Sequence, residues 1–199
     1  VYSVIMLFLK VILVIFILHV LLLIMQFLVA GAISGRNPLR ALKGMLPAYA
    51  TALGTSSSAA TIPVTLQCAI NNKVNPAIAS FTIPLCATIH LAGSTMKITG
   101  FALAIQYFFG IQIDIAAFIG FIFMLGIIMI AAPGVPGGAI MAAVGILQSI
   151  LGFNEQMIGL MITLYIAIDS FGTACNVTGD GAIALIVDKI SGKSETKTQ

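Results

Sequence analysis

Long, nearly uncharged apolar runs are the feature that most restricts how this chain can fold. The runs at 1–33, 76–111 and 157–190 each exceed the roughly 20 residues that cross a bilayer as a helix. Only 8% of the residues are charged, against about 25% in soluble domains. The runs are solid apolar blocks rather than the alternating pattern of a membrane β-barrel. The sequence therefore predicts an all-α, multi-pass protein of the lipid bilayer, in the plasma or inner membrane.

The basic residues indicate how the chain is oriented in that membrane. They lie at 36–43, at Lys73 and at 189–197, whereas Asp114 and Glu155 stand in the other loops. Short loops rich in lysine and arginine stay in the cytoplasm, so we expect these segments and the C-terminus to be cytoplasmic. A net charge of only +3, spread over short loops, fits this topology and does not favour binding to nucleic acid.

Two further apolar segments are interrupted before they reach a spanning length. The break in 45–75 is Gly-Thr-Ser-Ser-Ser at 54–58, and the break in 114–155 is the proline- and glycine-rich stretch 131–138. Non-helical backbone at that depth requires protein or a water-filled cavity around it. We therefore expect re-entrant hairpins that enter from opposite sides, each followed by a broken helix, an inverted repeat typical of secondary transporters. The predicted segments are a transmembrane helix (1–33), a cytoplasmic basic loop (34–44), hairpin 1 (45–75), a broken transmembrane helix (76–113), hairpin 2 (114–155), a broken transmembrane helix (156–190) and a cytoplasmic tail (191–199).

Polar residues gather late in the chain, in Tyr165–Asp180. Asp169, Asn176 and Asp180 are spaced by seven and then four residues, so they share one face of a helix. Carboxylates in a membrane helix are costly unless they are paired or bind ions, which makes them candidate functional residues. An enzyme is not predicted, because the serine run at 56–58 has no activating histidine or aspartate near it in the sequence.

Four motifs, in order along the chain, resemble the dicarboxylate/amino acid:cation symporter family, which includes glutamate and neutral amino acid transporters. The resemblance covers nearly the whole chain and corresponds to the C-terminal, transport-domain part of that family. It implies the glutamate-transporter fold and a secondary active symporter of the elevator type. The motifs are the serine-rich stretch Gly54–Pro63, the run Pro84–Ser94, the tip Gly134–Gly137, and Asp169 followed by Asn176–Asp180.

The resemblance also implies roles for individual residues. Asp169 would bind the ammonium group of an amino acid substrate, and Asn176 its α-carboxylate. Asp180 would bind sodium together with main-chain oxygens, and a second ion would use Thr88 with carbonyls near 130–133. The implied substrate site comprises Ser57, Ser94, Val135, Gly137, Asp169, Gly172, Thr173 and Asn176, and the implied sodium (Na+) sites comprise Cys86, Thr88, His90, Asn176 and Asp180.

The motifs depart from the family at positions that govern the choice of substrate and ion. Members that carry acidic substrates have an arginine where this chain has Gly172, and the hairpin tip has Thr55 in place of an alternative arginine. A guanidinium is the usual partner of a carboxylate, so we expect a neutral amino acid unless Lys97 supplies the missing charge. His90 and Ala92 replace an asparagine and an aspartate, which predicts fewer sodium ions per cycle, with proton (H+) coupling as an addition.

Other interpretations stay open at this point. The substrate could be an acidic amino acid or a C4-dicarboxylate, and the chain could be a channel or a non-transporting fragment. It begins with valine rather than methionine, so we expect a piece of a longer protein. The resemblance implies a homotrimer, assembled through N-terminal scaffold helices that this sequence does not contain.

Overall fold

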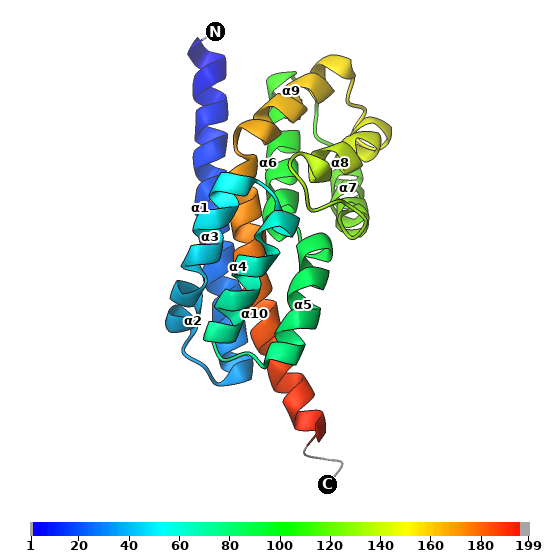
Figure 1. Ribbon diagram of the computed structural model, residues 1–199. Helices are drawn as coiled ribbons and strands as arrows, with labels where there is room; N and C mark the ends of the chain where they lie inside the picture. The colour runs from blue at the N-terminus through cyan, green and yellow to red at the C-terminus, as the bar shows by residue number, and fades with distance from the viewer. Residues whose placement is uncertain (1, 196–199) are drawn as a thin grey trace.

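The computed structural model describes residues 2–195, and its regular structure is helical over that range (Figure 1). Val1 and residues 196–199, which include the end of the predicted tail at 191–199, lie outside the described residues. The described helices are α1 (Tyr2–Ser34), α2 (Pro38–Gly44), α3 (Leu46–Thr55), α4 (Ser58–Asn71), α5 (Pro76–Ile89), α6 (Ala92–Phe108), α7 (Ile115–Met129), α8 (Gly138–Ser149), α9 (Glu155–Ala167) and α10 (Asp169–Glu195).

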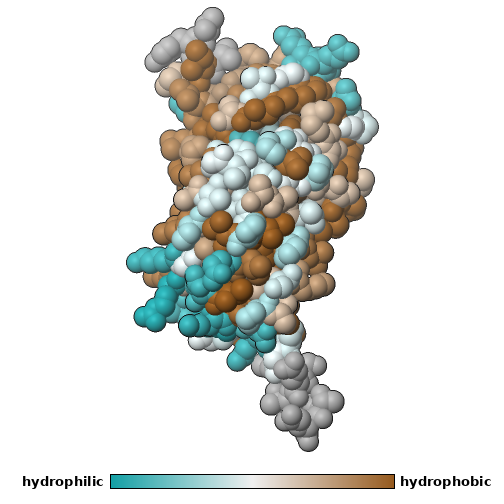
Figure 2. Space-filling view, in the orientation of Figure 1, coloured by the Kyte–Doolittle hydropathy of each residue, from teal (hydrophilic) through white to brown (hydrophobic). Residues whose placement is uncertain are grey.

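Helix α1 is apolar on nearly all sides. Ile5, Leu13 and Val20 are 53%, 59% and 57% exposed, and Figure 2 shows hydrophobic atoms, in brown, over much of the visible face. Side chains of this kind need lipid or protein around them rather than water. By length and composition, α1 and the α5–α6 segment can each cross a membrane, and the bent pair α9–α10 is a third such unit within the described residues.

Two pairs of shorter helices are each joined by a tip that is not helical. Helix α3 ends at Thr55, and Ser56 turns the chain back with a left-handed φ of 49°. Ser57 then caps α4, because its side chain accepts a hydrogen bond from the Ala60 amide. Helices α7 and α8 are separated by 130–137, where two prolines and two glycines prevent a continuous helix.

Two longer units are helices that break once. The break between α5 and α6 lies at His90 and Leu91, and the break between α9 and α10 lies at Ile168, where the two axes bend by 61°. Both breaks are buried, since Leu91 is 5% and Ile168 is 6% exposed. Because helix ends leave N–H and C=O groups without intrahelical partners, these breaks bring free backbone polar groups into the interior.

Helix α10 is the axis around which the other helices pack. It contacts α1, α3, α4, α5 and α6, and it lies between an apolar cluster built on α6–α9 and another built on α1–α5. Ala174, Ala182 and Ala184 of α10 are almost completely buried. Since small side chains allow membrane helices to approach closely, the polar groups of α10 come within reach of several neighbours.

The segments that carry most basic residues lie at one end of the molecule. The α1–α2 turn, the α4–α5 turn and the end of α10 lie together, opposite the N-terminus and the α8–α9 turn (Figure 1). Asp188 of α10 connects these three segments. Its Oδ2 accepts a hydrogen bond from Arg36 Nη2 at 2.9 Å, and its Oδ1 accepts one from the Asn75 backbone amide at 2.9 Å. The grouping fits the charge pattern of the sequence, while the side of the membrane that this end faces stays a prediction.

Candidate substrate and ion site

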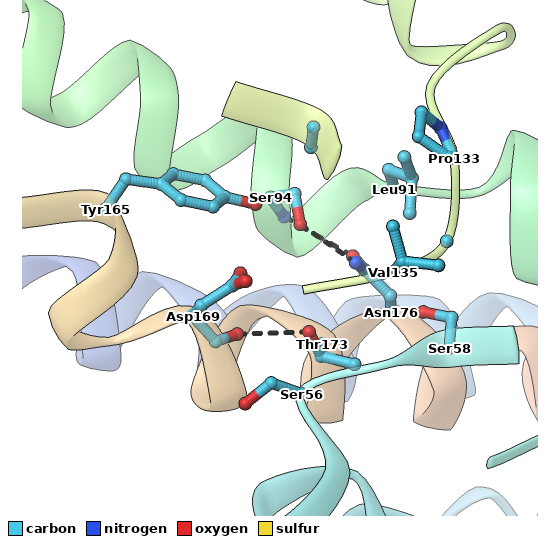
Figure 3. Close-up of a pocket in the computed structure, with 12 residues that line it drawn as sticks. Ser56, Ser58, Leu91, Ser94, Pro133, Val135, Tyr165, Asp169, Thr173 and Asn176 are labelled. Carbon is cyan, nitrogen blue, oxygen red and sulfur yellow. Dashed lines mark hydrogen bonds between the residues drawn. The ribbon is translucent and has the colours of Figure 1, made fainter. Parts of the chain in front are cut away.

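A small pocket lies where the two tips meet the two broken helices (Figure 3). Its free volume is about 10 Å³, which is room for a single water molecule. The lining is rich in hydroxyl groups and contains one carboxylate and one amide. The lining residues are Ser56, Ser58, Leu91, Ser94, Pro133, Gly134, Val135, Ala139, Tyr165, Asp169, Thr173 and Asn176.

The two tips contact each other directly through one carbonyl group. The Gly134 oxygen accepts a hydrogen bond from Ser57 Oγ at 2.9 Å and another from the Ala59 amide at 3.1 Å. A Cβ atom at position 134 would lie 2.5 Å from the Ala87 carbonyl oxygen. Only glycine therefore allows the second tip to approach α5 this closely. The contact joins the two tips at the edge of the pocket.

Asp169, at the first position of α10, is the carboxylate in the pocket. It is 6% exposed. Its Oδ1 accepts a hydrogen bond from Lys97 Nζ at 2.9 Å, and its Oδ2 accepts one from the Gly137 amide at 2.8 Å. Thr173, one turn later, donates its hydroxyl to the Asp169 carbonyl at 3.1 Å (Figure 3). The carboxylate therefore links the second tip to α6.

Lys97 of α6 is completely buried beside this carboxylate. Besides the 2.9 Å ion pair, its ammonium lies 3.4 Å from the carbonyl oxygens of Ile168 and Asp169 and 3.7 Å from the centre of the Tyr165 ring. The end of its side chain crosses Gly172: a Cβ atom there would lie 2.7 Å from Nζ and closer still to Cε. The missing side chain at position 172 thus creates the space that Lys97 fills.

Asn176 holds the start of α6 in place. Its Oδ1 accepts hydrogen bonds from the amides of Gly93 at 2.8 Å and Ser94 at 3.3 Å, and its Nδ2 donates to Ser94 Oγ at 3.0 Å. The side chain therefore satisfies two of the amides that the break before α6 leaves free. Figure 3 shows Asn176 and Ser94 facing the same space as Asp169.

Asp180 lies about three turns after Asp169 on α10, where it is almost completely buried. His90 Nδ1 lies 2.8 Å from its Oδ1, and His90 Nε2 lies 3.1 Å from Gln26 Nε2. The two nitrogens can form a hydrogen bond only if Gln26 donates and His90 Nε2 carries no proton. The His90 ring is then neutral, with its single N–H on Nδ1, which donates to Asp180. Gln26 Oε1 is buried with no hydrogen-bond partner in the part of the chain that is described.

Asp180 is the carboxylate that would hold a sodium ion at the α5–α6 break. Hard cations take oxygen ligands, and a broken helix exposes main-chain carbonyls to supply them. The Cys86 carbonyl lies at this break and accepts a hydrogen bond from the His90 amide at 2.9 Å. Asp180 and main-chain oxygens of His90 and Asn176 would hold the ion, although the His90 ring occupies one side of the carboxylate in this structure.

The structure brings together most, but not all, of the residues expected in the site. Ser94, Val135, Asp169, Thr173 and Asn176 line the pocket, Ser57 and Gly137 make hydrogen bonds at its edge, and Gly172 lies beneath Lys97.

Two residues stand apart from this arrangement. Thr88 lies on an exposed side of α5, and its hydroxyl donates to the Leu85 carbonyl at 2.9 Å. Gln26, on α1, was not expected in the site, because nothing in an apolar helix indicates that its amide reaches the α5–α6 break.

Known proteins resemble the chain along most of its length. The sequence model described as "Sodium:dicarboxylate symporter family" matches residues 1–190. Excitatory amino acid transporter 3 of Homo sapiens is 35% identical over 159 residues, which is 79% of this chain and 30% of that protein. The serine/threonine transporter SstT of Acinetobacter baumannii is 34% identical over 175 residues, which is 86% of this chain and 44% of that protein.

The chain therefore spans less than half the length of these relatives. Excitatory amino acid transporter 5 of Mus musculus shows the same pattern, with 33% identity over 162 residues, 81% of this chain and 29% of that protein. The matches confirm the resemblance that the four motifs indicate, and they concern transporters rather than enzymes. Because the match to the family extends over residues 1–190, this chain belongs to the sodium:dicarboxylate symporter family.

Proposed function

We propose that this chain is the transport domain of a secondary active symporter that couples the uptake of an amino acid to a sodium gradient. The observation that carries the proposal is the small pocket between the two tips, with the buried carboxylate of Asp169 facing it. Asp169 can accept the ammonium group of an amino acid. The side-chain amide of Asn176, which has one N–H left after its bond to Ser94, and the backbone amides at the tips are donors for its carboxylate.

We propose a substrate with a neutral side chain. The lining of the pocket offers hydroxyl groups at Ser56, Ser58 and Ser94, and Gly172 contributes no cation. The nearest ammonium, on Lys97, is already paired with Asp169. A second carboxylate on the substrate would therefore lack a free cationic partner among the described pocket residues.

An acidic amino acid or a C4-dicarboxylate is the second candidate, and Lys97 is the observation that favours it. If its ammonium left Asp169, a cation would become available within the pocket. A channel or a non-transporting fragment would neither accumulate a substrate nor couple its movement to an ion. Uptake into liposomes therefore distinguishes both from the two candidate symporters.

For coupling, we propose sodium at Asp180 with main-chain oxygens of Cys86, His90 and Asn176; bound there, the ion supplies a positive charge between α5 and α10. Ala92 removes a carboxylate expected for a further sodium site, so fewer ions would move per cycle. A proton on His90 is the alternative cation. Rotation of the Gln26 amide would then place its unpartnered Oε1 against a protonated Nε2.

In the membrane, we propose that α3–α4 and α7–α8 are re-entrant hairpins, that α5–α6 and α9–α10 are broken spanning helices, and that the C-terminus is cytoplasmic. The domain would move across the bilayer as a unit, in the elevator manner, against scaffold helices that hold a homotrimer in the cell membrane. Residues 36–43, Lys73 and Lys189 supply the positive charge expected of the cytoplasmic side.

Uptake into liposomes tests the proposal. The protein is reconstituted, and radiolabelled L-serine, L-alanine, L-glutamate and L-aspartate are offered with and without an inward sodium gradient. We expect sodium-dependent accumulation of L-serine or L-alanine above equilibrium. Accumulation of the acidic amino acids alone would favour the second candidate, and passive conductance without accumulation would favour a channel. His90→Asn should remove any response to a proton gradient, and uptake that ignores pH in the unmodified protein contradicts the proton alternative.

A further inference from the structure

Lys97 has no part in the proposed binding of a neutral amino acid, yet it is a completely buried charged group that contacts the pocket carboxylate, Asp169. It is 0% exposed, and its ammonium has an acceptor on each side: the Asp169 carboxylate at 2.9 Å, two carbonyl oxygens at 3.4 Å and the face of the Tyr165 ring at 3.7 Å. A buried ammonium needs such a set of partners. The position is therefore built for a cation.

The space for this cation depends on Gly172. A Cβ atom at that position would overlap the Lys97 side chain near Cε and Nζ. Any larger side chain at position 172 would push the Lys97 ammonium away from Asp169. The glycine and the lysine, which lie on different helices, thus act together to place a positive charge on the carboxylate.

The same carboxylate is the group that an amino acid substrate needs. Oδ1 of Asp169 is paired with Lys97, and Oδ2 accepts the Gly137 amide. The free volume of about 10 Å³ leaves no room for a substrate in this conformation. Once the tips move apart, the Gly137 amide would leave Oδ2, and an incoming ammonium group would compete with Lys97 for the Asp169 carboxylate.

We propose that Lys97 is an internal cation that neutralises Asp169 whenever the substrate site is empty, and that the ammonium group of the substrate displaces it. The inference rests on the proposed function of amino acid transport. An unpaired carboxylate buried to this extent is strongly unfavourable. Pairing with Lys97 allows the empty domain to close and to cross the membrane, so that one cycle of net uptake can follow another.

This role separates two kinds of transport. Net uptake requires the empty domain to return, whereas exchange of internal for external substrate keeps the site loaded in both directions. Replacing Lys97 by methionine keeps a flexible apolar side chain and removes the charge. The change should slow the return of the empty domain far more than the movement of the loaded one.

The test uses Lys97→Met in the protein reconstituted in liposomes, with labelled L-serine as the probe. We expect the ratio of net uptake to exchange to fall by at least about ten-fold, since Asp169 is left as an unpaired buried charge. Binding of L-serine in detergent should become tighter, because its competitor for Asp169 is gone. Lys10→Met is the matched control: it removes a lysine from the lipid-facing helix α1, where Lys10 is exposed, and should leave the ratio unchanged.

Gly172→Ala gives a second, independent variant that keeps the charge but closes the space for it. We expect a smaller fall in the same ratio. Gly159→Ala is its control, because a Cβ atom there meets nothing within 4 Å. Size-exclusion profiles and thermal unfolding confirm that each variant is folded.

Each outcome bears on a different claim. If the unmodified protein neither exchanges nor accumulates any of the four amino acids offered in the uptake test, the proposed function falls and takes this inference with it. If the unmodified protein transports and the folded Lys97→Met variant keeps its ratio of net uptake to exchange, the inference alone is wrong. Weaker binding of L-serine by that variant would also overturn it, because Lys97 would then be a direct partner of the substrate carboxylate.

Discussion

Asp169 and Asp180 are two buried carboxylates on one helix, and each is paired with a basic side chain from the α5–α6 segment, yet the two pairs differ in kind. Asp169 meets Lys97, which is completely buried, whereas Asp180 meets His90, whose side chain is 15% exposed. A lysine ammonium is charged in such a pair, but a histidine ring can donate to a carboxylate while it is neutral. The Lys97–Asp169 pair is therefore an ion pair, whereas the His90–Asp180 pair can be a hydrogen bond to a neutral ring.

The two pairs thus hold their carboxylates in different charge states. In the first pair, the Lys97 ammonium makes the empty site neutral, and in the role proposed for Lys97 it leaves Asp169 only when another cation arrives. In the second pair, a neutral His90 ring leaves the Asp180 carboxylate negative and open to a small cation. Substitutions at and around each pair separate these two states.

Removing Asp169 should have the largest effect. Asp169→Ala leaves the Lys97 ammonium buried without a carboxylate, which typically costs about 3–5 kcal/mol of stability, and it should abolish uptake. The double variant Asp169→Ala/Lys97→Met removes both charges and should recover most of the thermal stability in detergent, but no uptake. Equal melting temperatures for the single and double variants would contradict the claim that an unpaired ammonium is the cause.

Removing Asp180 should cost less stability. Asp180→Ala leaves a neutral imidazole that keeps its contact with Gln26, so we expect a loss of about 1–2 kcal/mol, the penalty for a hydrogen-bonding group that has lost its partner. Uptake should lose its dependence on sodium. Thermal unfolding with and without sodium chloride, against potassium chloride as the control, measures both effects. A loss as large as that of Asp169→Ala would mean that His90 is charged in the folded protein.

Replacing Gln26 should affect the second pair only. Gln26→Leu removes the donor to His90 Nε2 together with an unpartnered buried oxygen, and the two changes oppose each other, so stability should change by no more than about 1 kcal/mol. If protons bind at His90, the pH profile of uptake should shift as well. Uptake profiles from pH 5.5 to 8.5 measure this. Gln106→Leu, which also removes an unpartnered buried oxygen but lies on α6, is the matched control.

The third acid–base pair of α10 should matter least. Arg36 and Asp188 are 31% and 16% exposed in their side chains, so water screens this pair more than the two buried pairs, and ion pairs at the surface contribute about 0–1 kcal/mol. Arg36→Gln should therefore lower the thermal stability only slightly, and the small loss should shrink in high salt. A loss of thermal stability comparable to that of Asp169→Ala would show that burial does not explain the difference between the Arg36–Asp188 and Lys97–Asp169 pairs.

Much of the fold could be predicted because lipid imposes a simple composition on the elements that cross it. The apolar runs and the interruptions at 54–58 and 131–138 already indicated helices and non-helical tips. The face that Asp169, Asn176 and Asp180 share on α10 follows directly from helical spacing. The family resemblance supplied the roles of these residues, which remain proposals here.

The partners of the two carboxylates could not be predicted from sequence. Lys97 lies 72 residues before Asp169, and only the packing of α6 against α10 shows that its side chain crosses Gly172. The absence of a side chain at 172 indicated a lost arginine, but not that another helix fills the same space with an ammonium. His90 and Gln26 meet for a similar reason, because a break in one helix faces the middle of another.

The Gly134 carbonyl, which accepts hydrogen bonds from both the Ser57 hydroxyl and the Ala59 backbone amide, has a consequence for any separation of the tips. If the tips move apart, one oxygen loses two donors, and the hydroxyl and the amide each lose their acceptor. Buried donors without an acceptor are unfavourable, so both need a new partner. Under the proposed function, the carboxylate of an amino acid is a group that can accept from both.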